Sequence, residues 1–161
     1  MARQYYGPKA FRDAIEQTGC LNFKAGLSAI KRGEGRGDIT AKDNSKALGG
    51  ADIDGDCRDA YPNDNRWDYA LGYNRSNEAI AFFIEVHGAG SHDVDIMEKK
   101  LNWLQKTFLQ RASSRMLSCL KREYHWVLHG RFNIPKHVPQ YKELLRLQRR
   151  LNGPTKSLEL Q

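Results

Sequence analysis

The chain lacks the features that mark membrane, secreted and nucleotide-binding proteins. Among its 161 residues, no apolar run is long enough to cross a bilayer, and the first residues hold no apolar signal-peptide core, so we expect a cytoplasmic protein without a membrane partner. Its 3 cysteines, Cys20, Cys57 and Cys119, match neither a zinc pattern nor a disulfide framework, and are most simply small apolar fillers. A P-loop, a dinucleotide fingerprint and a serine nucleophile elbow are also absent.

Composition predicts one basic globular domain over residues 1–161. The net charge is +7, and it is unevenly distributed. Residues 1–99 carry 13 Lys and Arg against 16 Asp and Glu, whereas residues 100–161 carry 13 against 3. An acidic first part suits a cation and a basic second part suits phosphates, so the layout favours nucleic acid as a partner. The alternative is a solvated basic surface that serves only solubility.

Hydrophobic patterning predicts a mixed sheet with helices on its faces. Residues 66–73 and 79–87 are rich in aromatic and β-branched side chains, and the polar run between them predicts a hairpin turn. Apolar residues then recur at helical spacing from Val94 to Phe108, before a strand over 124–128. This strand, helix, strand order predicts a parallel βαβ unit. The remaining expected elements are helices over 8–18, 24–31, 55–60 and 138–151, short strands over 47–53 and 157–160, the latter closing the sheet edge, and a loop over 33–38.

Asp68 and Glu85 are the leading candidates for chemistry. The expected hairpin brings both carboxylates to one end of the sheet, and Glu85 follows five apolar residues, where a carboxylate is costly to bury. Two converging acids suit a hard divalent cation such as Mg²⁺. The segment from Asp52 to Asp56 fails the EF-hand spacing, which leaves one of its acids, Asp54 first among them, as a supplementary metal ligand or a helix N-cap.

The order helix, three strands, helix, strand resembles the core of the PD-(D/E)xK, or restriction-endonuclease-like, nuclease superfamily. Asp68 and Glu85-Val86-His87 resemble its two motif elements, with His87 standing where the family has Lys, and Glu16 resembles the additional acid of the first helix. The strings Arg66-Trp67-Asp68-Tyr69 and Ile84-Glu85-Val86-His87 are similar, more narrowly, to a group of small bacterial proteins. The resemblance implies an αβββαβ core.

The resemblance also implies a metal-dependent endonuclease or exonuclease that hydrolyses phosphodiester bonds in DNA or RNA. Asp68, Glu85 and the Val86 carbonyl would bind Mg²⁺ or Mn²⁺, and His87, Lys99 or Lys100 would meet the developing charge. The basic residues expected to contact nucleic acid are Lys99, Lys100, Arg146, Arg149 and Arg150. The alternative is an inactive nuclease-fold module that binds nucleic acid or a protein partner, including a second copy in a homodimer.

Overall fold

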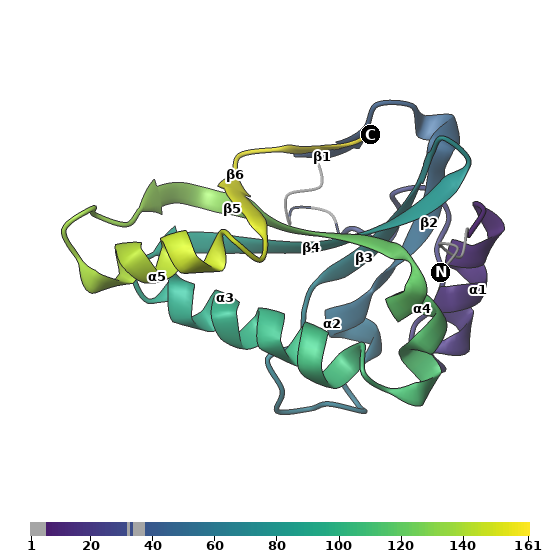
Figure 1. Cartoon of the computed structure of the whole chain (residues 1–161), viewed down its shortest axis with the longest axis horizontal. Helices are drawn as coiled ribbons and strands as arrows, with labels where there is room; N and C mark the ends of the chain where they lie inside the picture. Colours follow the sequence, from purple (N-terminus) through teal and green to yellow (C-terminus); the bar gives the residue numbers. More distant parts are fainter. Residues whose placement is uncertain (1–5, 32, 34–37) are drawn as a thin grey trace, which may run out of the picture.

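The computed structural model describes residues 6–31, 33 and 38–161, and these form a mixed α/β structure (Figure 1). The helices are α1 (Lys9–Gln17), α2 (Ile53–Asp56), α3 (Asp93–Asn102), α4 (Arg115–Cys119) and α5 (Pro139–Leu147), with a π-helical segment at Trp103–Phe108 and short 3-10 turns at Asn44–Lys46 and Ala112–Ser114. The strands are β1 (Ile39–Ala41), β2 (Ala47–Asp52), β3 (Tyr69–Arg75), β4 (Glu78–Gly90), β5 (Lys121–Asn133), β6 (Asn152–Thr155) and β7 (Leu158–Leu160).

The main sheet has five strands in the order β2-β3-β4-β5-β6. The β2–β3 and β3–β4 pairs are antiparallel, while β4–β5 and β5–β6 are parallel. Helix α3 lies in the connection between β4 and β5, so the expected parallel βαβ unit is confirmed. The mixed sheet and its flanking helices are confirmed with it.

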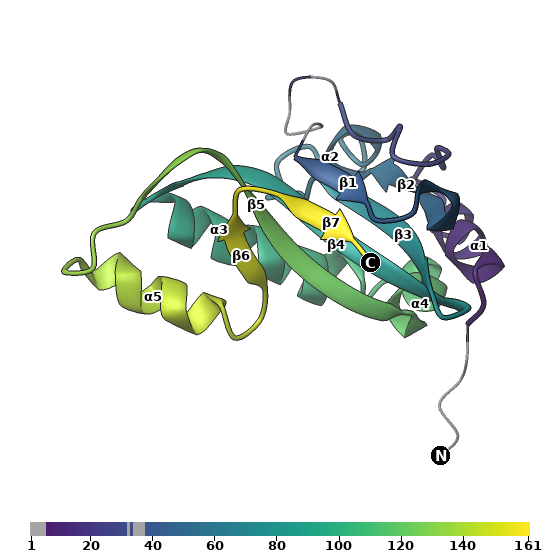
Figure 2. The same ribbon diagram turned by 90° about the horizontal axis from the view of Figure 1, so that it is seen from above.

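Each face of the main sheet packs against its own hydrophobic core, because successive side chains along β4 point to opposite faces. Ala81 and Phe83 join the helix-side core, whereas Phe82 and Ile84 join a second core on the opposite face. In Figure 1, α1, α3, α4 and α5 lie along one face, and the small parallel sheet of β1 and β7 covers the other. Figure 2 shows β7 lying over the main sheet from above.

The C-terminal part differs from the sequence prediction. The last strand was expected to close the main sheet, but β7 pairs with β1 in a separate sheet. The edge is formed instead by β6, which directly follows the segment predicted as a helix over 138–151. Accordingly, α5 is shorter than the expected 138–151 helix and ends at Leu147.

Two further predictions concern the N-terminal part. The helix expected over 24–31 is wrong: this segment consists of turns, and Gly26 has a φ of +56°, which a right-handed helix does not allow. Residues 34–37 of the loop expected over 33–38 lie outside the described residues. Among the described helices, none is both long and apolar enough to cross a membrane.

Candidate functional site

A tight hairpin turn sets Asp68 opposite Glu85. Ser76 and Asn77 link β3 to β4, and both have positive φ, at 52° and 64°, as the two central residues of a type I′ turn require. The resulting register pairs Arg75 with Glu78 and continues to Tyr69 with Ile84. Asp68 and Glu85 are the next residues beyond the Tyr69–Ile84 pair, one on each strand of the hairpin. Their side chains therefore share the helix-side face of the sheet.

Reciprocal hydrogen bonds hold the two carboxylates in place. The Asp68 backbone N–H donates to Glu85 Oε2 at 2.9 Å, and the Val86 N–H donates to Asp68 Oδ2 at 2.9 Å. The Glu85 side chain is fully buried, whereas that of Asp68 is 20 % exposed. The hydrogen bonds partly compensate the cost of burying a charged group at Glu85.

Lys100 joins these two acids from helix α3. Its ammonium forms an ion pair with Glu85 Oε1 and lies 3.6 Å from Asp68 Oδ1. Lys100 follows the buried Met97 by one helical turn, so the packing of α3 on the sheet brings its side chain to β4. One cationic group thus contacts two carboxylates that the hairpin has already oriented.

The pKa values of Glu85 and Lys100 reflect this arrangement. Burial raises the pKa of Glu85 well above its ordinary value, and the Asp68 charge raises it further, against the opposing effect of Lys100. For Lys100, burial lowers the pKa, but the attraction of Glu85 and Asp68 outweighs burial and leaves the pKa raised. Lys100 is therefore cationic at neutral pH, and Glu85 takes up a proton more readily than an ordinary glutamate.

His87 lies beside this group and is oriented by α3. Its Nε2 is 3.1 Å from Asp93 Oδ1, and its Nδ1 is 3.8 Å from Glu85 Oε1. Asp93 is itself held by the Gly90 N–H, which donates to Asp93 Oδ2 at 2.6 Å. Asp93 therefore holds the His87 imidazole at the edge of the site.

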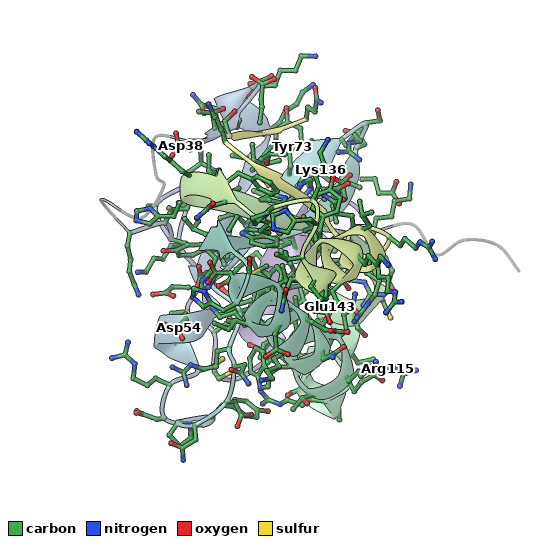
Figure 3. The ribbon with its side chains drawn as sticks, turned by 90° about the vertical axis from the view of Figure 1, so that its left-hand side faces the viewer. Asp38, Asp54, Tyr73, Arg115, Lys136 and Glu143 are labelled. Carbon is green, nitrogen blue, oxygen red and sulfur yellow. The ribbon has the colours of Figure 1, made fainter. Side chains whose placement is uncertain are left out.

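These residues open into a cleft of about 270 Å³ whose lining is mostly charged or polar. Asp52 accepts a hydrogen bond from the Gly55 N–H at the start of α2 and pairs with Lys31 at 3.3 Å. Asp54 pairs with Arg66 at 3.0 Å. Figure 3 shows Asp54 on the opposite side of α3 from Glu143 of α5. The lining residues are Lys31, Asp52, Asp54, Asp68, Tyr69, Glu85, Val86, His87, Lys100 and His129.

The donor set fits a hydrated hard cation. Asp68 and Glu85 offer carboxylate oxygens on either side of the Lys100 ammonium, in a position that already attracts positive charge. In a strand, the N–H and C=O of one residue point to the same edge, so the Val86 carbonyl faces the side of β4 where Asp68 lies. Among the described residues, no group of three or more His, Cys, Asp or Glu side chains could hold a metal. Mg²⁺ commonly uses one or two carboxylates and keeps several waters, so two carboxylates suffice for it.

Other predicted site residues lie away from this cleft. Glu16 is exposed on α1 and pairs with Arg12 at 2.8 Å. Lys99 is exposed and pairs with Asp95 at 2.7 Å. The predicted arginines Arg146, Arg149 and Arg150 are not among the cleft residues.

The arginines form a separate basic region near α5 and β6. Arg149 shares a shallow hollow with Arg122 of β5. Arg150 borders this hollow and donates to Asn102 and Gln105, each at 2.8 Å. Arg146 lies nearer the acidic residues Glu98 and Glu143 of a neighbouring hollow.

Sequence reasoning missed Lys31, Asp93 and His129, whereas Asp52 belongs to the acidic segment that it had considered. Asp93 and Lys100 are seven residues apart on α3, a spacing that places both on one helix face, and this signal was present in the sequence. Lys31 and His129 had no local signal, because only the tertiary fold brings their segments to the cleft.

Comparison with known proteins gave no relative from which a role could be transferred. No family model matches the chain, and no curated protein and no solved structure is significantly similar to it.

Proposed function

We propose that this protein is a metal-dependent nuclease of the PD-(D/E)xK type. The observation that carries the proposal is the convergence of Asp68, Glu85 and Lys100 in one open cleft. The order of α1, β2, β3, β4, α3 and β5 supports it, because it is the order that the αβββαβ core of that superfamily requires.

The residues of the cleft divide the chemistry among them. Asp68, Glu85 and the Val86 carbonyl would hold Mg²⁺ or Mn²⁺, and the bound ion would supply Lewis-acid activation of the phosphate and of the attacking water. Lys100 supplies the positive charge that the motif expects two residues after Glu85, and supplies it from helix α3 instead. A fixed cation at this point stabilises charge that develops on the phosphate.

His87 has a different role in this scheme. Sequence alone placed it in the position of the family lysine, but Lys100 is the cation that contacts both carboxylates, while His87 bonds to Asp93. We assign His87 to proton transfer at the edge of the cleft, because an imidazole held by a carboxylate can act as a general acid or base. The two assignments predict different losses on substitution.

The substrate is a phosphodiester polymer, either DNA or RNA. The cleft itself carries four acidic residues, so the phosphate backbone needs basic groups outside it. Arg122 and Arg149, together in the hollow between β5 and β6, can meet an adjacent stretch of backbone. In this scheme the reacting phosphate would lie in the cleft, and the rest of the polymer would extend over basic surface.

The decisive experiment measures cleavage of single- and double-stranded DNA and RNA with Mg²⁺ or Mn²⁺. Wild type should cleave only with metal, and Asp68→Asn should abolish cleavage. Lys100→Met should cost about 10²–10³-fold, the usual worth of a group that stabilises transition-state charge. His87→Gln should cost about 10²–10⁴-fold, the usual worth of a positioned general acid or base. Lys99→Met is the matched control, because Lys99 is the neighbouring lysine and its side chain is exposed and pairs with surface Asp95. Equal cleavage by wild type and Asp68→Asn would refute the proposal.

A second candidate is a non-catalytic nucleic-acid-binding module. It is favoured by the ammonium of Lys100, which already neutralises charge between the two carboxylates without any metal. Salt-dependent binding of nucleic acid by a wild type that cleaves nothing with either metal would support this candidate. Binding that ignored salt would instead favour a protein partner.

A further inference from the structure

Two cysteines far apart in the sequence meet outside the cleft. The Sγ atoms of Cys20 and Cys57 lie 3.1 Å apart, within hydrogen-bond distance for sulfur. Cys20 follows helix α1 and is partly exposed, whereas Cys57 directly follows helix α2 and is fully buried. A shift of about 1 Å would bring the two sulfur atoms to disulfide bonding distance. We call these residues the cysteine pair.

Arg111 is placed to stabilise a thiolate at Cys20. Its Nη1 is 3.4 Å from Cys20 Sγ, and its Nη2 donates to the Thr18 carbonyl at 3.3 Å. The guanidinium also lies 5.6 Å from the ring centroids of Tyr61 and Phe108, which fix its position. The structure thus brings a charged donor and a second thiol to one sulfur atom.

The two thiols differ in proton affinity. The hydrogen bond from Cys57 lowers the pKa of Cys20 to about 6, and Arg111 lowers it too, while partial burial opposes both. The same hydrogen bond and burial raise the pKa of Cys57. Cys20 is thus the nucleophile of the pair and Cys57 its protonated partner.

We infer that the cysteine pair is a hydroperoxide-reactive site that closes to a Cys20–Cys57 disulfide. The Cys20 thiolate attacks one oxygen of the peroxide, the O–O bond breaks, and the leaving hydroxide takes a proton to become water. The product is a sulfenic acid on Cys20. Cys57 then attacks this sulfur, the S–O bond breaks, and the hydroxyl group leaves as a second water with the Cys57 proton. Two thiols lose two electrons to one molecule of hydrogen peroxide, which they reduce to two waters.

This disulfide would tether helix α2, which forms part of the cleft lining. Helix α2 begins beside Asp52 and contains Asp54, and both line the cleft. Asn22 already connects the segment after α1 to α2, since its N–H donates to Asp56 at 2.8 Å. A disulfide two residues before Asn22 adds a covalent tie to the same junction. The inference does not depend on nuclease activity.

The test uses the intact protein and hydrogen peroxide. Reduced wild type is exposed to hydrogen peroxide, and the remaining thiols are blocked with N-ethylmaleimide under denaturing conditions. The protein is then digested without a reducing agent, and the peptides are identified by mass spectrometry. The expected product is a peptide joining Cys20 to Cys57, with Cys119 recovered as the alkylated form. Cys119→Ser should behave like wild type. Arg111→Met should react several-fold more slowly, because less thiolate is present.

A second variant separates the two steps. Cys57→Ala should stop at the sulfenic acid of Cys20, which dimedone captures in proportion to peroxide consumed. If Cys57→Ala does not fold, the wild-type peptide map decides. Recovery of Cys20 and Cys57 as separate alkylated peptides after peroxide, or a linked peptide that contains Cys119 instead, would overturn the inference.

Discussion

Lys100→Met tests whether the two carboxylates form a cation site. The change keeps most of the side-chain length but leaves Glu85, with 0 % of its side chain exposed, beside Asp68 without its cation. Removing one partner of a buried ion pair costs about 3–5 kcal/mol. Because Glu85 can take up a proton in response, we expect the lower end, about 3 kcal/mol at about pH 8.

The loss should depend on pH in a defined direction. The pKa of Glu85 is raised in the folded protein above its ordinary value of 4.5, so the folded state holds a proton that the unfolded state releases. The stabilisation from this proton is fully present below that ordinary value and disappears as pH rises through the folded pKa. Without Lys100 the folded pKa rises further. Lys100→Met should therefore be closer to wild type at about pH 5 than at about pH 8.

Urea unfolding at both pH values, with and without Mn²⁺, measures these differences. At a hundredfold excess over its dissociation constant, the ion should restore about 2.7 kcal/mol to Lys100→Met. The control Lys99→Met removes a lysine whose side chain is 58 % exposed, and should change stability by no more than about 0.5 kcal/mol. Equal stability of wild type and Lys100→Met at both pH values would refute the buried ion pair. No stabilisation by Mn²⁺ would refute the cation site.

Three other predictions concern separate parts of the molecule. A disulfide between residues 37 positions apart should stabilise by about 4 kcal/mol and raise the midpoint of thermal unfolding by roughly 10 °C, measured by calorimetry of reduced and oxidised protein. Gly72→Ala should lower the free energy of unfolding by about 1–3 kcal/mol in urea, because the added Cβ overlaps the Phe11 ring of α1. Arg149→Glu should weaken nucleic-acid binding and reduce its salt dependence in fluorescence anisotropy, and unchanged affinity at low salt would remove this surface from the proposal.

Local patterns accounted for the hairpin and the long helix. The side chains at Val94, Met97, Leu101, Leu104 and Phe108, predicted as one helical stripe, are all buried. The period of the helix breaks only at its C-terminal end, where residues 103–108 are π-helical. These elements were predictable because each buries a face that its own sequence defines.

The remaining elements depend on partners that are distant in the sequence. Strand β7 has three residues and pairs with β1, more than a hundred residues earlier, so nothing local identified its sheet. The contact of Lys100 with the two acids could not be predicted for the same reason. Its neighbours on α3 indicate that its side chain lies near the sheet, but they do not indicate which strand residues it contacts. His87 is two residues from Glu85 in the sequence, but Lys100 is the side chain that forms ion pairs with both Glu85 and Asp68.

The hairpin turn also has a consequence for recognising related chains. The arms between turn and carboxylates are equal, Tyr69–Arg75 on one side and residues 78–84 on the other. Extra residues at the tip would lengthen the loop and leave the acids facing each other. A single insertion within one arm would reverse the alternation and turn one acid to the opposite face. Divergent descendants can therefore differ in the separation of Asp68 and Glu85, provided that the length change is confined to the tip.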